Sequence, residues 1–400
     1  MQTRKDCWNF EYSAHSICIC TNFAYIIPLK SAHFLPHTTS EIHTLSKLPK
    51  IPSKICAVKE MISKMGCQLK VALLFWSLIA AIITTQRAAS ASIRIDFYDQ
   101  TCPRAEKIIF TEMQKILQRP EFKNAPAQLL RLFFHDCFIG GCDASVLLNT
   151  GNLQDEKQAG PNLSLKGFEI INMIKEALER ECPVIVSCSD ILVIATRDAM
   201  ILSGGPFYPV YTGRRDSKVS FLQKASLEIP SPMDHIDKIL MLFAQRGFTA
   251  RETVALLGGH SIGFISCAFI QPRINNDTNP DPYIGDDFKE EIRQRCEKRN
   301  SNFSMMDPQQ LSSASSSSPF TSHFGTHYYE SLTRRRGLLF SDMELMANEQ
   351  TAAVVEEYVS DDGSTFQRDF ITALVKMSNL VTLTGSQGEV RLNCSVPLNT

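Results

Sequence analysis

From residue 105 onwards, apolar residues recur at spacings of three and four in six segments separated by polar turns. That spacing places apolar side chains on one face of an α-helix. The segments are AEKIIFTEMQKILQR (105–119), APAQLLRLFFHDCF (125–138), FEIINMIKEALERE (168–181), SDILVIATRDAMIL (189–202), MDHIDKILMLFAQRG (233–247) and FQRDFITALVKMSNL (366–380). Long runs of alternating apolar and polar residues are scarce, so the pattern predicts a mostly α-helical protein built as a pair of helical domains.

A different apolar pattern precedes these segments. Lys70 is followed by an uncharged apolar run from Val71 to Ile83, which is short for a membrane span of about 20 residues. Ala89-Ser90-Ala91 then offers a small-residue cleavage site. These features predict a secretory signal peptide over residues 65–91, and a mature domain over residues 92–400.

A signal peptide beginning at Met65 leaves residues 1–64 upstream of the natural start. We interpret residues 1–64 as a mispredicted upstream extension, with a genuine additional targeting segment as the alternative. The 13 cysteines divide at the same boundary, with five before residue 70 and eight after residue 100. Eight cysteines are compatible with four disulfides in an oxidising, extracellular compartment.

The overall charge gives no reason to expect a polyanionic partner. The chain has 41 Lys and Arg against 42 Asp and Glu, a formal net charge of −1. We therefore expect no nucleic-acid binding and no stable membrane insertion. The basic run 334–336 is interpreted as solvated, and the serine tract from Ser312 to Pro319 as a flexible loop.

The stretch RLFFHDCFIGGCDAS, residues 131–145, concentrates candidate chemistry. Arg131 and His135 are four residues apart and so share one helix face. A guanidinium beside an imidazole disfavours the imidazolium form, which keeps His135 available as a base. Fixed positive charge next to a base suits a reaction in which a proton is removed while negative charge develops nearby.

The same stretch carries hard oxygen donors. Asp136, Asp143 and Ser145 lie within ten residues of one another, and a bridge between Cys137 and Cys142 could close the loop. Carboxylates, hydroxyls and backbone carbonyls are the ligands that calcium prefers. This composition suits a calcium loop, although its spacing is not that of an EF-hand.

The stretch GGHSIG, residues 258–263, has two interpretations. It contains G-x-S-x-G, the turn that exposes the nucleophilic serine of an α/β-hydrolase, which would make Ser261 the reactive residue. His260 could instead be the working residue, with glycines that let a flat cofactor approach. The upstream TARE, residues 249–252, resembles a helix capping box, whereas a nucleophile turn follows a strand.

Eight motifs in order resemble those of the secreted plant haem peroxidases (class III). They are RLFFHDCFIGGCDAS, DEKQAGPN, VSCSDIL, GRRDS, IPSP, GGHSIG, GLLFSDMEL and GSQGEVRLNC, and the resemblance covers about residues 92–400. The resemblance implies a haem peroxidase fold in which distal and proximal helical domains sandwich one haem b. It also favours His260 over Ser261 as the working residue of GGHSIG.

The resemblance assigns roles to individual residues. His260 is implied as the proximal ligand of the haem iron and Asp342 as its carboxylate partner, while His135 and Arg131 act on hydrogen peroxide. Asn162 matches the residue that hydrogen-bonds the distal histidine. Pro230, in IPSP, matches the edge where small phenolic donors approach.

The resemblance further implies two calcium sites and four disulfides. The distal site takes side chains of Asp136, Asp143 and Ser145 with carbonyls of Asp136, Ile139 and Gly141. The proximal site takes Ser261 and Asp307, but Gly325 stands where a second carboxylate is expected, so we expect that site to be weak or empty. The implied bridges are Cys102–Cys182, Cys137–Cys142, Cys188–Cys394 and Cys267–Cys296.

The sequence thus predicts a secreted, monomeric peroxidase that oxidises phenolic donors in one-electron steps. Two alternatives stay open at this point. One is a secreted serine hydrolase that uses Ser261, and the other is a calcium-binding surface protein without catalytic activity.

Overall fold

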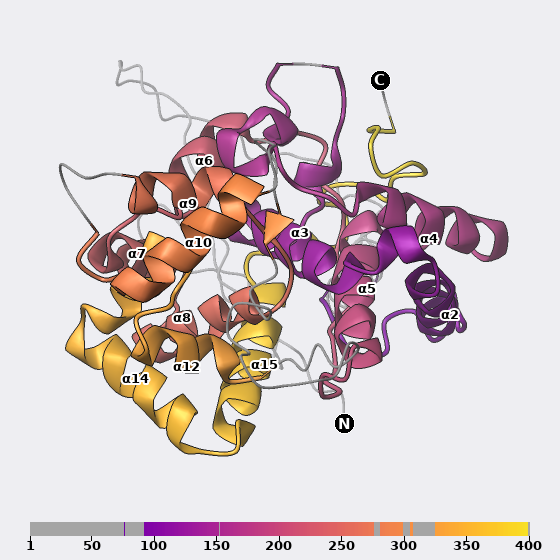
Figure 1. Ribbon diagram of the computed structural model, residues 1–400. Helices are drawn as coiled ribbons and strands as arrows, with labels where there is room; N and C mark the ends of the chain where they lie inside the picture. Colours follow the sequence, from indigo (N-terminus) through magenta and orange to yellow (C-terminus); the bar gives the residue numbers. More distant parts are fainter. Residues whose placement is uncertain are drawn as a thin grey trace, which may run out of the picture. The chain divides into compact units, whose positions relative to one another are not determined.

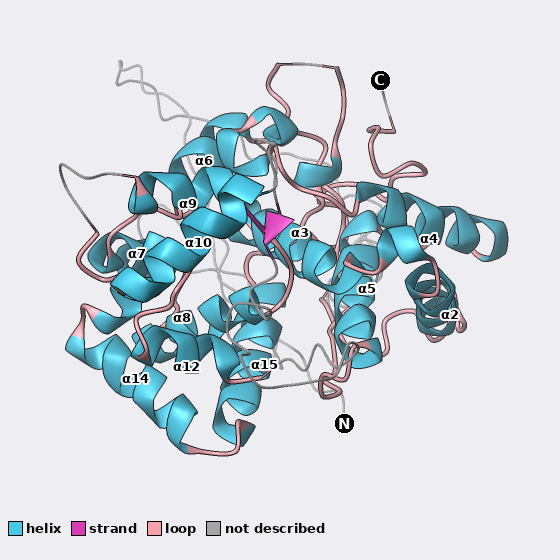
Figure 2. Ribbon diagram, in the orientation of Figure 1, coloured by secondary structure: helices cyan, strands magenta, loops and turns pink. Residues whose placement is uncertain are grey.

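The computed structural model describes Trp76 and residues 92–151, 153–275, 281–298, 305–306 and 325–398. All of these except Trp76 belong to one compact unit, Ser77–Thr400. Its described part is mostly helical, with a single pair of two-residue antiparallel strands, β1 (Ile265–Ser266) and β2 (Met305–Met306) (Figure 2). The prediction of a mostly α-helical fold is confirmed.

The described helices follow one another closely along the chain. They are α2 (Ala105–Leu117), α3 (Ala125–Gly140), α4 (Phe168–Glu181), α5 (Cys188–Leu202), α6 (Leu222–Glu228), α7 (Ile236–Ala244), α8 (Ala250–Leu257), α9 (Cys267–Ile274), α10 (Asp286–Lys298), α12 (His327–Thr333), α13 (Phe340–Met343), α14 (Glu349–Ser360) and α15 (Ser364–Ser378). Short 3₁₀ turns include η3 (Glu156–Gln158), η4 (Gly160–Asn162) and η5 (Gly258–Ser261).

All six helices predicted from the apolar pattern are present, with ends shifted by a few residues. The largest shift is at α7, which begins at Ile236 and not at Met233. The carboxylate of Asp234 accepts a hydrogen bond from the Ser231 amide, 2.8 Å away, and His235 is extended. A turn therefore occupies the residues that the periodicity assigned to the first helical turn.

The helices form two groups that meet at α3. Helix α2 packs against α4 and α5, and α5 packs against α3. In the second group, α8 packs against α14 and α15, and α12 packs against α14. Figure 1 shows α3 between α5 and the group that contains α8, α12, α14 and α15. Contacts of α3 with α15 join the groups, and apolar residues of both belong to one buried cluster.

The four cysteine pairs implied by the resemblance all lie at disulfide bonding distance, which confirms the pairing. They are Cys102–Cys182, Cys137–Cys142, Cys188–Cys394 and Cys267–Cys296. None of the described helices is long and apolar enough to cross a bilayer.

The C-terminal segment folds back onto the loop that follows α3. The Arg391 guanidinium donates to the carbonyl of Ala144 at 2.6 Å, and the Arg391 amide donates to the Asp216 carboxylate at 2.9 Å. The bridge from Cys394 to Cys188, the first residue of α5, fixes the same segment. The loop after α3 is therefore held by residues from the far end of the chain.

Candidate active site

Helix α3 carries Arg131 and His135 and has a defined start and end. Pro126 lies in its first turn, where a missing amide hydrogen removes no helical bond. The helix ends at Gly141, whose φ is +85°. A Cβ at this position would lie 1.7 Å from the carbonyl oxygen of Val381, so the close approach and the backbone angle both require glycine.

His135 is buried and held through one ring nitrogen. The residue is only 5% exposed, and its Nδ1 atom lies 2.6 Å from Oδ1 of Asn162. Asn162 lies in η4 and donates from its own amide nitrogen to the Glu156 carbonyl at 2.8 Å. Because the amide nitrogen is engaged there, Oδ1 faces His135 as an acceptor. His135 then carries its proton on Nδ1, and Nε2 has a free lone pair.

The surroundings keep His135 neutral. Burial and the positive charge of Arg131 lower the pKa of His135 to about 3, while the hydrogen bond to Asn162 acts in the opposite direction. A neutral imidazole with an unprotonated Nε2 is what a general base requires.

Arg131 is held by the segment that contains Asn162. Its guanidinium donates to the carbonyl of Pro161 at 2.9 Å and to the hydroxyl of Ser164 at 3.0 Å. The residue is exposed, yet burial lowers the pKa of its guanidinium. The protein that surrounds this exposed side chain disfavours the charged form of the guanidinium.

His260 lies in η5, directly after α8. The capping box expected at Thr249 and Glu252 is present and starts α8, so a helix and not a strand leads into GGHSIG. His260 Nδ1 lies 2.8 Å from Oδ1 of Asp342, in α13. Burial opposes protonation, but the Asp342 carboxylate raises the pKa of His260 above its usual value.

His260 lies close enough to Arg131 for the guanidinium charge to act on its imidazole. The His260 side chain is 48% exposed, although burial acts on its pKa, and the charge of Arg131 also lowers that pKa. The η5 segment lies close to α3, since a Cβ at Gly259 would contact Leu130 at 3.3 Å and one at Gly263 would lie 2.8 Å from Ala127. An imidazole whose Nδ1 is bound to a carboxylate, together with a neutral base and a guanidinium, is a set of residues that suits a haem iron site.

Comparison with known proteins agrees with this arrangement. The family model described as Peroxidase matches residues 109–361. Peroxidase 56 of Arabidopsis thaliana is 40% identical over 306 residues, which cover 76% of this chain and 89% of that protein. Peroxidase 27 of the same plant is 39% identical over 322 residues, which cover 80% of this chain and 96% of that protein.

The chain belongs to the class III plant haem peroxidases. It is an enzyme that reduces hydrogen peroxide with electrons from donor substrates, and haem is its cofactor. Nothing supports the serine hydrolase alternative: in this peroxidase the Ser261 hydroxyl is buried, with no hydrogen-bond partner in the described part of the chain. Nor does any finding favour a non-catalytic surface protein.

The loop after α3 gathers the expected distal calcium residues. Asp136, Asp143 and Ser145 are all at most 3% exposed. The Asp136 carboxylate accepts from the Ala144 amide at 2.9 Å, and that of Asp143 accepts from the Ser145 amide at 3.0 Å. Burial and the neighbouring Asp143 raise the pKa of Asp136 well above its usual range, and burial also raises the pKa of Asp143 although the charge of Arg391 opposes this.

Two buried oxygens of this loop have no partner among the described residues. They are the Ser145 hydroxyl and Oε2 of Glu156, a residue that the sequence analysis did not single out. Burial raises the pKa of Glu156 to about 7, and Asp143 adds to this effect. Within the residues described, no cluster of three His, Cys, Asp or Glu is placed to hold a metal. The donor set is thus two carboxylates, a hydroxyl and backbone carbonyls, which still suits calcium.

The structure gives less information on the remaining predicted site residues. On the proximal side, the buried, unpartnered hydroxyl of Ser261 suits a cation ligand, but Asp307 lies outside the described residues. Gly325 precedes α12. Pro230 is half-buried between α6 and α7.

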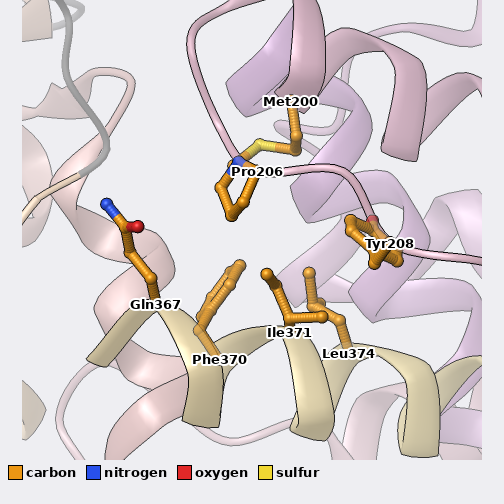
Figure 3. Close-up of a pocket in the computed structure, with 7 residues that line it drawn as sticks. All are labelled: Met200, Pro206, Tyr208, Gln367, Phe370, Ile371 and Leu374. Atoms are coloured by element: carbon orange, nitrogen blue, oxygen red, sulfur yellow. The ribbon is translucent and has the colours of Figure 1, made fainter. Parts of the chain in front are cut away.

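A pocket lies between the end of α5 and α15 (Figure 3). Six of its lining side chains are apolar or aromatic, Gln367 being the exception: Met200, Pro206, Tyr208, Phe370, Ile371 and Leu374. It contains neither His135 nor His260 and offers no group that could carry out peroxidase chemistry.

Proposed function

We propose that this peroxidase uses His135 as the proton-transferring base, Arg131 as the fixed cation and His260 as the ligand of the haem iron, and that its donors are small phenols. The observation that carries the proposal is the contrast between the hydrogen-bond partners of the two histidines. Nδ1 of His135 is held by a neutral amide, 2.6 Å away, and Nδ1 of His260 by a carboxylate, 2.8 Å away. The first partner leaves a neutral base, and the second makes its imidazole a stronger electron donor.

Haem, when bound, would supply the redox centre that accepts the two oxidising equivalents of peroxide and passes them to the donor. Nε2 of His135 would take a proton from one oxygen of the peroxide and return it to the other, outer oxygen. Water then leaves as the O–O bond breaks, and Arg131 stabilises the negative charge that develops on the outer oxygen. The hydrogen bond to Asn162 keeps one proton on Nδ1 of His135, so Nε2 is the atom that takes up and releases the transferred proton.

Calcium belongs to the same proposal. The side chains of Asp136, Asp143 and Ser145, with the carbonyls of Asp136, Ile139 and Gly141, would hold one ion in the loop directly after α3. Its positive charge would offset the two buried carboxylates, whose pKa values are raised in its absence. The loop is continuous with α3, so its order bears on the position of His135.

We further propose that the mature protein is an extracellular monomer that begins near Ser92. The predicted signal peptide and the four disulfides support an oxidising destination. Pro230 is proposed to line the edge where donors approach. Monolignols, flavonoids, auxin and wall proteins are the donor classes to compare.

The experiment is a stopped-flow measurement of the haem absorbance change after mixing the purified holoenzyme with hydrogen peroxide. His135→Ala is expected to keep its haem and circular dichroism but to react about 10²–10⁴-fold more slowly. His235→Ala, at a histidine whose side chain is 77% exposed, serves as the matched control. Near-normal reactivity of His135→Ala would overturn the assignment, and a donor panel then ranks the phenols.

A further inference from the structure

His327, the first residue of α12, contacts the backbone next to the proposed iron ligand. Its Nε2 lies 2.9 Å from the carbonyl oxygen of Ser261. A carbonyl oxygen can only accept, so Nε2 carries the hydrogen and donates it. Ser261 directly follows His260 and ends η5. The imidazole of His327 therefore holds the peptide unit one residue away from His260.

The segment around His260 needs such external contacts. Glycines stand at 258, 259 and 263, and Gly263 has a φ of +100°. Glycine gives a backbone more conformational freedom than any other residue does. The orientation of His260 is thus not fixed by its own segment and must come from the elements packed against it.

Helix α12 contacts both the carboxylate partner of His260 and the backbone that follows His260. Tyr328 donates its hydroxyl to Oδ1 of Asp342 at 3.0 Å, the same oxygen that lies 2.8 Å from His260 Nδ1. Its ring also stands edge-on to the imidazole of His260, with centroids 6.1 Å apart. Consecutive residues of one helix therefore hold the carboxylate partner of His260 and the backbone beside it.

His327 also stands close to a position where this chain departs from the expected pattern. Gly325 stands where the family resemblance implies a second carboxylate of a proximal calcium loop, for which Ser261 is the expected hydroxyl ligand. Two residues further on, His327 offers a hydrogen-bond donor to that same Ser261. The backbone beside His260 thus has a protein partner that needs no metal ion.

We propose that His327 is a positioning residue, whose hydrogen bond to the Ser261 carbonyl sets the orientation of His260 towards the haem iron. This rests on the proposed ligation by His260. In this role His327 acts through the Ser261 carbonyl, in the peptide unit that follows His260, and not on the reacting atoms. A side chain that can donate from the same place should replace it, and an apolar one of similar size should not.

The test compares His327→Leu, His327→Gln and the wild-type holoenzyme. The control is Thr333→Ala, an exposed hydroxyl on the same helix that donates to the Glu330 carbonyl. The iron–histidine stretching band of the reduced protein is recorded by resonance Raman spectroscopy. The rate of haem transfer to an acceptor apoprotein and the unfolding temperature of the haem-free protein are measured alongside it.

His327→Leu is expected to shift the band and to lose haem about 2- to 10-fold faster, as for one net hydrogen bond. His327→Gln should restore both towards wild type, and Thr333→Ala should change neither. An unshifted band with unchanged haem loss in His327→Leu overturns the proposal, and so does a folded His327→Gln that behaves like the leucine variant. If His327→Leu does not fold, His327→Gln decides the question. A band at the wild-type position supports the proposal, and a shifted or missing band overturns it. A wild-type protein without the band would instead overturn ligation by His260.

Discussion

The Oδ1 atom of Asn162 accepts a hydrogen bond from Nδ1 of His135 over 2.6 Å, while the Nδ2 atom of the same amide donates to the Glu156 carbonyl over 2.8 Å. The second contact fixes which end of the amide faces the imidazole, because a carbonyl cannot donate. The proton of His135 is thereby assigned to Nδ1. The reactive lone pair is on Nε2, which faces away from Asn162.

Replacing Asn162 by Ala should slow the reaction with peroxide by about 10-fold or more, because the imidazole loses the acceptor that selects its basic form. Haem absorbance should stay unchanged. Stopped-flow mixing with hydrogen peroxide measures the effect. If Asn162 acts only through His135, the double variant Asn162→Ala/His135→Ala should be no slower than His135→Ala alone, whereas additive losses would contradict this.

The pH profile of the peroxide reaction should extend well into acid. Burial and the charge of Arg131 lower the pKa of His135 to about 3, so the base stays deprotonated from pH 6.5 down to this value. The rate should be level from neutral pH downwards and fall with a midpoint near this value. Rapid pH-jump mixing is needed because acid also destabilises the fold: between about pH 6.5 and 3 only the unfolded state protonates this histidine, so stability falls as pH falls.

Arg131→Leu provides the control for this profile. The substitution removes one of the two causes that lower the pKa of His135. The acid midpoint should therefore move upwards, in addition to the loss of rate expected from removing the cation. An unchanged midpoint would mean that Arg131 does not act electrostatically on His135.

Ser164 should contribute to peroxide reactivity without touching the reacting atoms. Its hydroxyl accepts from Arg131 at 3.0 Å and, with the Pro161 carbonyl, holds the guanidinium. Ser164→Ala should lower the rate of the peroxide reaction about 2- to 10-fold, the value of one net hydrogen bond. Ser164→Thr, which keeps the hydroxyl, should react normally, and equal rates for both variants would exclude this role.

Asp342→Asn should raise the reduction potential of the haem iron. An amide is a weaker acceptor than a carboxylate, so His260 would become less anionic and would stabilise oxidised iron less. Potentiometric titration followed by the haem spectrum measures the change. A lower or unchanged potential would contradict the pairing of His260 with Asp342.

Metal analysis should find one firmly held calcium per haem after mild chelation. The distal loop keeps two carboxylates and the unpartnered Ser145 hydroxyl, whereas the proximal loop has Gly325 in place of a carboxylate. Ser145→Ala should reduce retention of the ion, and Gly325→Asp should add a second. Two calciums retained by the unmodified protein would refute the prediction.

Much of this site could be predicted because its residues occur in compact motifs. Helical spacing alone predicts that Arg131 and His135 share a helix face, whereas their catalytic roles came from the resemblance. The capping box at Thr249 and Glu252 was readable from four residues. The pairing of His260 with Asp342 and the four disulfides came from the resemblance, since they join residues far apart in sequence. Local patterns carry no information on such contacts.

The contacts of Glu156, Ser164 and His327 were not predicted. Glu156 and Ser164 lie between α3 and α4, and His327 begins α12. At such positions a buried acid or a donating imidazole has the same local pattern as a solvated one. Their function depends on which carbonyl or hydroxyl the fold brings to them. For His327 the available signal was its place two residues after Gly325, which by itself names no partner.

The contact between Arg391 and the Ala144 carbonyl spans 247 residues, and the bridge from Cys188 to Cys394 spans 206. During synthesis the N-terminal part of a chain emerges and begins to fold first. The loop after α3 is therefore made early but acquires its last partners only when the final residues have been added. Until then Cys188 has no native partner, so a nascent chain arrested before residue 391 should carry a free thiol at Cys188 and an unfinished loop beside its catalytic helix.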